Sequence, residues 1–287
     1  MDFLWEQIQQ WIKEALVGGI TANFTGMFDE INLKVGEIAA QVGQTPQGWN
    51  GSIFSMIRSL SDTVIIPIAG MILTFVMCYE LINMIIDKNN MNDTDTFMFF
   101  KWIFKTFVAV YIVTNTFDIV MGVFGLAQHV VQGSAGIITG STNITLQLDG
   151  LQQTLEAMEW YALIGLYMES MILSFLMKAI SLCIFIIVIG RMIEIYVVCS
   201  IAAIPFATMV NKDWGQMGNN YLRSLFALGF QGFLIMVCVA IYAVLAQGIT
   251  TSENIHLAIW TCAGYTVLLC FTLFKTGSVA KSIFNAH

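Results

Sequence analysis

The feature that most constrains this chain is a series of uninterrupted apolar stretches, several of them longer than the roughly 18 residues that a helix needs to cross a bilayer. Within a bilayer, only helices and closed barrels satisfy all of their backbone hydrogen bonds. Barrel strands would appear as short segments of alternating polarity, whereas these runs are long and unbroken. The sequence therefore predicts an all-α fold, a polytopic membrane helical bundle.

Composition agrees with this prediction and excludes some functions. The chain is 57% hydrophobic and 11% charged, whereas soluble domains are typically about 25% charged. Its net charge of −7 disfavours a large basic surface that would bind nucleic acid through its phosphates, so any DNA contact must be local. All six cysteines fall inside apolar stretches without a CxxC motif, and we interpret them as small buried side chains.

The first part of the chain predicts amphipathic helices rather than a span. Residues 3–17 place apolar side chains on one helical face and charged or amide side chains on the other, and residues 24–42 repeat this pattern after Gly18 and Gly19. We expect two helices that lie along the membrane interface or pack on a partner. The turn-rich residues 44–51 then separate these helices from the membrane region.

Five spanning helices are predicted after this break. The third apolar region, residues 161–209, is too long for one span and is interrupted by charges. We expect one long helix from about residue 155 to 198, followed by a break or a short helix around Pro205. Two crossings in this region remain the alternative, and they would reverse the orientation of everything that follows. The other four spans are expected at about residues 63–86, 102–127, 225–247 and 255–274.

The distribution of lysine and arginine predicts the orientation, because these residues collect in cytoplasmic loops. Residues 128–160 contain neither, whereas the segments around Lys88 and Lys281 do contain lysine. The N-terminus is therefore expected outside and the C-terminus in the cytoplasm. This orientation divides the chain into extracytoplasmic or interfacial amphipathic helices in residues 1–61 and a transmembrane bundle in residues 62–287, with an extracytoplasmic loop at 128–160.

No residue pattern in the sequence points to catalysis, to a cofactor or to a metal. The three histidines are scattered, and the sequence contains no metalloprotease or nucleophile motif. It also lacks a nucleotide-binding glycine loop, so any ATP-driven step would need a separate ATPase. We therefore expect a protein that is not an enzyme.

Six ionisable residues fall at membrane depth, where a charge costs roughly 2.5 to 3.5 kcal/mol and usually faces a partner or water. One interpretation is that they form ion pairs that fix the packing of the bundle, as Arg191 and Glu194 could do three residues apart on one helix. The other interpretation is that they line a water-filled passage or a subunit contact. The six candidates are Glu80, Asp118, Glu169, Lys178, Arg191 and Glu194.

Residues 195–233 carry the most characteristic pattern: an apolar helix that ends in Ala-Ile-Pro-Phe, a polar segment with Trp214, and another span. Together with the opening MDFLWEQIQQWIKEALVGGI and the ending TLFKTGSVAKSIFNAH, this region resembles the TrbL-like polytopic conjugal transfer proteins. These are equivalent to the sixth VirB component of type IV secretion systems, here in the branch carried by Gram-positive conjugative elements. Pro205 and Trp214 are the family-like positions.

The resemblance implies an inner-membrane component of a conjugative machine, with an outside N-terminus, about five spans and a cytoplasmic C-terminus. Such a protein would help form the translocation passage or its assembly platform and meet the single-stranded DNA substrate while separate ATPases supply energy. We therefore hypothesise a channel or scaffold subunit that sits in membrane lipid, contacts other secretion subunits and acts as a homo-oligomer.

Two other classes of function remain as alternatives. A self-contained secondary transporter or ion channel should show paired interrupted helices in repeated halves, and the sequence shows one proline break without a counterpart. An intramembrane enzyme should carry a reactive pair, such as two aspartates at facing depths, which the sequence lacks.

Overall fold

The computed structural model of the chain describes residues 2–86, 96–139, 148–247 and 255–286. Within these residues nearly all of the backbone is helical, and no strand is present. This confirms the all-α prediction. Residues 87–95 and 248–254, which lie between predicted spans, are outside the described residues.

The helices form two compact units, each built from segments that are far apart in the sequence. The first unit contains Met1–Val42, Gln132–Val188 and Leu234–Thr276. The second unit contains Gly43–Val131, Ile189–Phe233 and Gly277–His287.

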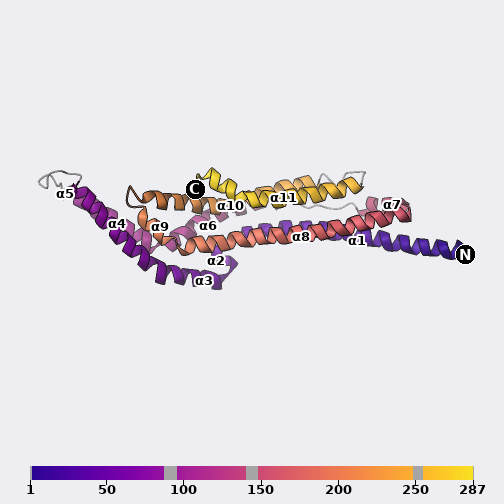
Figure 1. The fold of residues 1–287 in the computed structure, drawn as a ribbon, viewed down its shortest axis with the longest axis horizontal. Coiled ribbons are helices and arrows are strands. Elements are labelled where there is room, and N and C mark those ends of the chain that lie inside the picture. The colour runs from indigo at the N-terminus through magenta and orange to yellow at the C-terminus, as the bar shows by residue number, and fades with distance from the viewer. Residues whose placement is uncertain (1, 87–95, 140–147, 248–254, 287) are drawn as a thin grey trace. The chain divides into compact units, whose positions relative to one another are not determined.

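In the first unit, a long N-terminal helix lies beside a second long helix, and the two run in the same direction (Figure 1). The side-chain amide of Asn23 donates to the Ser170 hydroxyl at 3.0 Å, and the Ser181 hydroxyl donates to Glu30 at 2.5 Å. The elements of this unit are α1 (Asp2–Val42), α7 (Leu148–Ala157), the first part of α8 (Trp160–Ser200), the last part of α10 (Gly215–Gln247) and the first part of α11 (Ile255–Ile283).

The prediction of two separate amphipathic helices in residues 3–42 is wrong, because α1 continues through the two glycines at its centre. A Cβ added at Gly19 would lie 2.6 Å from Cε2 of the Tyr167 ring. The absent side chain therefore lets α8 approach, and it does not end the helix. The buried face, which includes Ile20, Phe24 and Met27, continues along the same side of α1.

The second unit begins where the sequence predicts a break. The Thr45 hydroxyl accepts a hydrogen bond from the Gly48 amide, and the Asn50 side chain accepts two more, from the amides of Ser52 and Ile53. Such side chains cap the unpaired amides at helix starts. Two short turns therefore redirect the chain here, α2 (Pro46–Trp49) and the start of α3 (Gly51–Leu60).

The first span is longer than predicted. The helix runs without a gap from α3 through a π-helical turn, η1 (Ser61–Ile65), into α4 (Ile66–Ile86). In this turn the Ile66 amide bonds to the Ser61 carbonyl, five residues back, and Pro67 follows, which lacks an N–H and cannot bond to the carbonyl one turn earlier. Continuity through this turn moves the start of the span from about residue 63 back to Gly51.

The second predicted span, 102–127, is wrong as a single helix. The chain forms α5 (Thr96–Thr114) and α6 (Thr116–Thr139), interrupted at Asn115. Three consecutive polar side chains at this point bond back to carbonyls of the preceding turn, with the Asn115 amide donating to the Tyr111 carbonyl at 2.9 Å. Side chains of this kind compete with the helical backbone pattern and bend helices.

The third apolar region is one long helix, α8, followed by a short helix, α9 (Ala203–Thr208). This confirms the single helix with a short element around Pro205. Much of the expected loop at 128–160 is helical, since α6 continues to Thr139 and α7 follows; residues 140–147 lie outside the described part.

The predicted number of spans is confirmed. In the described part of the chain, five helices are long and apolar enough to cross a membrane. They are Gly51–Ile86, Phe97–Thr114, Trp160–Ser200, Gly215–Leu245 and Ala263–Ile283.

Candidate functional site

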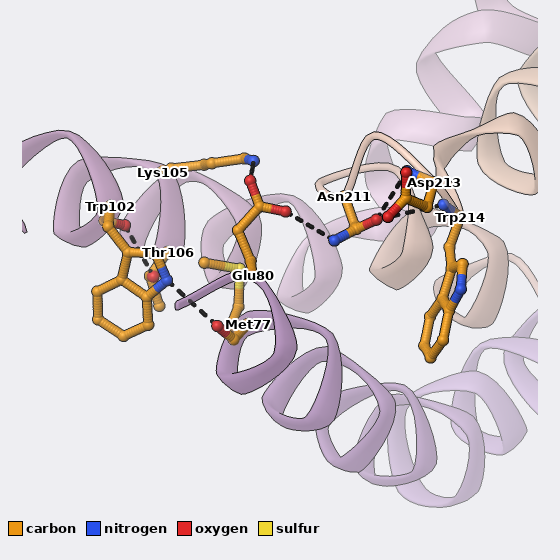
Figure 2. Close-up of polar contacts among 8 residues, drawn as sticks. All are labelled: Met77, Glu80, Trp102, Lys105, Thr106, Asn211, Asp213 and Trp214. Carbon is orange, nitrogen blue, oxygen red and sulfur yellow. Dashed lines mark hydrogen bonds and ion pairs between the residues drawn. The ribbon is translucent and has the colours of Figure 1, made fainter. Parts of the chain in front are cut away.

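A polar and aromatic junction in the second unit joins α4, α5 and the segment that follows α9 (Figure 2). The Lys105 ammonium donates to Glu80 Oε1 at 2.6 Å, and Asn211 Nδ2 donates to Glu80 Oε2 at 2.7 Å. Both carboxylate oxygens of Glu80 are therefore used. Hydrogen bonds to an ionised group are the stronger kind, so this carboxylate links three segments of the fold.

Asn211 connects this charge pair to Trp214. Its side chain is only 3% exposed, and its Oδ1 accepts from the amides of Asp213 at 2.7 Å and Trp214 at 3.3 Å. The indole of Trp214 then stacks on the rings of Tyr79 and Phe75, at centroid distances of 5.7 and 5.5 Å. One amide side chain therefore holds both the ion pair and the turn that presents the tryptophan.

Pro205 lies at the other edge of the junction, where α9 and α10 approach closely. A Cβ added at Gly218 would lie 2.5 Å from the Pro205 carbonyl oxygen, and one added at Gly215 would lie 3.1 Å from the Met209 carbonyl oxygen. Only glycine fits at Gly218 without displacing backbone. Of the two family-like positions, Pro205 therefore packs against α10, whereas Trp214 stacks on α4.

Small residues let α9 pack directly on the first span. Ala203 and Ala207 form a buried cluster with Ala69 and Leu73 of α4 and with Val113 of α5. Close packing of small residues is a common mode of helix association in membranes. The indole N–H of Trp102 adds a hydrogen bond from α5 to the Met77 carbonyl of α4, at 3.2 Å.

Asp118 forms an exposed ion pair in the same unit. Its carboxylate lies 3.1 Å from the Arg58 guanidinium, which also lies over the Phe117 ring. The two side chains are 46% and 59% exposed, so this ion pair lies outside the buried core of the unit.

Arg191 and Glu194 do not form a hydrogen-bonded pair in this arrangement. Glu194 Oε1 lies 3.6 Å from the Lys281 ammonium on α11. Arg191 is 7% exposed, and its guanidinium donates to the Gly229 carbonyl at 3.4 Å, while its Nε has no partner among the described residues. The two residues thus serve different contacts.

The remaining two candidates lie on α8 in the first unit. Glu169 accepts a hydrogen bond from the indole N–H of Trp260 on α11. Lys178 is exposed, and within the described residues it has no hydrogen bond or ion pair. None of the six sequence candidates contacts another of the six through a hydrogen bond or ion pair in the part that the structure describes.

Sequence reasoning missed the residues that complete the junction: Lys105, Asn211, Tyr79 and Phe75. Asn211 is the most important of these, and a signal for it was present. It is followed by Lys-Asp-Trp directly after a helix, and asparagine in such a position commonly bonds to amides two and three residues later.

The fold defines a multi-pass membrane protein whose polar residues at the junction serve to join helices. Residues 31–203 match the family described as TrbL/VirB6 plasmid conjugal transfer like protein. The match covers more than half of the chain, and the chain belongs to this family. It is accordingly a conjugal transfer component of type IV secretion systems, in a lipid environment with other secretion subunits.

The family match includes all six ionisable candidates and ends two residues before Pro205. Pro205 and Trp214 both lie outside the matched residues. No curated protein and no solved structure matches the chain.

Proposed function

We propose that this protein is a channel or scaffold subunit, without enzymatic activity, that acts as a homo-oligomer in DNA transfer across the bacterial cytoplasmic membrane. The observation that carries the proposal is the family match, which covers the first three spans. Family members of this kind work as parts of a machine, and separate ATPases would supply the energy here.

The N-terminus lies outside and the C-terminus in the cytoplasm in this proposal, since the lysines and arginines gather at the ends of the spans that would face the cytoplasm. The junction then lies on the cytoplasmic side. Trp214 remains 39% exposed while its ring stacks on α4. A rigid, partly exposed tryptophan at this position suits contact with the cytoplasmic ATPases or with arriving DNA.

The six ionisable residues divide in this proposal by their contacts. Glu80, Glu169 and Arg191 fix helix packing, because each is at least partly buried and bonds to a group on another helix. Asp118, Lys178 and Glu194 remain for a passage or a subunit contact, because their side chains are exposed.

The test is a mating assay with a chromosomal deletion complemented by the intact chain or by Trp214→Ala. We expect the deletion to abolish transfer and Trp214→Ala to lower it, with both proteins present in membranes at equal amounts. Met217→Ala is the matched control, since Met217 is exposed on the neighbouring turn.

Cross-linking of substrate DNA during mating separates a channel from a scaffold. DNA cross-linked to this chain supports contact with the substrate in transit. Loss of transfer without any such cross-link leaves the scaffold function. Solute or ion transport by the purified chain alone in liposomes would instead indicate a self-contained transporter.

A further inference from the structure

Two helix faces in the first unit carry exposed residues that repeat every three or four positions. Part of the α1 face, from Gly18 to Asp29, also lines an open hollow whose other wall is formed by Gln152, Glu156, Glu159 and Trp160. The α1 seam consists of Ala15, Gly18, Ala22, Gly26, Asp29 and Leu33, all of which are exposed. The α8 seam consists of Met168, Met171, Phe175, Lys178, Leu182 and Phe185, which are also all exposed. A sustained spacing of this kind matches the contact line of one helix packed along another.

The α8 seam is poorly suited to lipid or to water. Lys178 lies in its middle, within a helix apolar enough to span a membrane, and an exposed charge there costs roughly 2.5 to 3.5 kcal/mol in lipid. If the seam faced water instead, Phe175, which is 76% exposed, and its apolar neighbours would be hydrated, which is unfavourable. A protein surface with one carboxylate would suit this seam, because the carboxylate could pair with Lys178 while the rest of the surface covers the apolar side chains.

The α1 seam brings one carboxylate at the matching height. α1 and α8 run in parallel within the unit, and their cross-helix hydrogen bonds join residues 147 and 151 apart in sequence. Adding these separations to 29 places Asp29 level with residues 176 to 180 of α8, hence level with Lys178. Among the described residues, neither Asp29 nor Lys178 forms a hydrogen bond or an ion pair.

Side-chain size is complementary at the same heights. The same separations place Gly26 level with Phe175 and Ala22 level with Met171. A Cβ added at Gly18 or Gly26 meets no atom within 4 Å, so the fold of the unit itself does not require glycine there. Glycine inside a helix costs about 1 kcal/mol relative to alanine, whereas it allows a neighbouring helix to approach closely.

We propose that the α1 seam of one copy packs in parallel against the α8 seam of a neighbouring copy, with Asp29 of one facing Lys178 of the next. Rotation about an axis along the helices keeps every residue at its own height, so identical copies present the two charges to each other around a ring. The inference rests on the proposed function only in requiring several copies in the assembly.

The test is charge reversal on the full-length protein in nanodiscs, with mass photometry to measure the oligomer. Asp29→Lys and Lys178→Asp each place like charges at the contact, and we expect each to weaken association by about tenfold or more. The double variant restores the pair and should restore the oligomer. Glu6→Lys is the matched control, because it makes the same charge change on the polar side of α1 and off the seam.

A second measurement covers the case in which a reversal prevents insertion. Asp29→Cys and Lys178→Cys are combined in a chain whose native cysteines are replaced by alanine, and α1 itself contains none. A short bis-maleimide should then link copies to each other, whereas Glu6→Cys with Lys178→Cys should not.

Three outcomes overturn the inference: single reversals that leave the oligomer intact, a double variant that fails to restore it, or a wild-type chain that is monomeric. The proposed function is judged separately, by mating. A monomeric chain that is still required for transfer would remove the seam contact and leave the secretion role in place.

Discussion

The junction predicts that Asn211→Ala disconnects Trp214 from the Glu80–Lys105 pair. The asparagine makes a hydrogen bond to an ionised carboxylate, which is worth about 1.5 to 3 kcal/mol, and accepts a well-placed backbone bond from Asp213, worth about 0.5 to 1.5 kcal/mol. The 3.3 Å bond from the Trp214 amide is long, and in the variant water can replace the Asn211 oxygen as the acceptor for this amide. Local stability should therefore fall by about 2 to 4 kcal/mol.

Hydrogen exchange, followed by mass spectrometry in detergent or nanodiscs, measures this loss of local stability directly. Because about 1.4 kcal/mol corresponds to a tenfold change in an equilibrium, amides of residues 211–215 should exchange at least about 30 times faster in Asn211→Ala. Asn219→Ala is the control, since Asn219 is an exposed residue on the first turns of α10. Unchanged exchange in residues 211–215 would refute the reasoning, because the turn would then be held by something other than Asn211.

Three further predictions follow from particular contacts. Gly218→Ala should lower the melting temperature of the protein in detergent, because the added Cβ would meet the Pro205 carbonyl. Gly264→Ala is the control, since a Cβ there has open space and should leave the melting temperature unchanged. Equal melting temperatures of the two variants would contradict the close approach of α9 and α10. Asp118→Asn should leave the amount of protein unchanged, because the pair with Arg58 is exposed, and should reduce transfer in a mating assay if Asp118 faces the passage; loss of protein would favour a packing role. Deletion of residues 2–42 should leave an inserted protein that neither oligomerises nor supports transfer, and intact oligomers would count against a role of α1 in assembly.

The features that could be predicted from the sequence are those set by the length and position of its apolar stretches and turn residues. The number of spans and the single long helix at Trp160–Ser200 follow from apolar length, which is local information. The break before the first span also followed from turn residues, and the structure shows how Thr45 and Asn50 form the caps.

Features that depend on contacts between distant segments could not be predicted in the same way. Gly19 reads as a helix break in isolation, yet the Tyr167 ring, which lies against it, gives it a packing role. The break at Asn115 was missed because the apolar run continues through it, while its polar side chains bond to the preceding turn.

The junction shows the same limit. Glu80 was chosen because of its charge and depth, but its partner Asn211 is 131 residues away in the sequence. Pairing over such a distance is set by the packing of α9 on α4, which small residues such as Ala203 and Ala207 permit. The local sequence around these alanines does not indicate which helix packs against them.

The most direct test of this assembly is cryo-electron microscopy of the purified chain in nanodiscs. We expect a closed ring of identical copies, with α1 of each copy against α8 of the next and Asp29 facing Lys178 at each contact. A monomer that encloses a polar pocket of its own would contradict it and would favour a self-contained transporter.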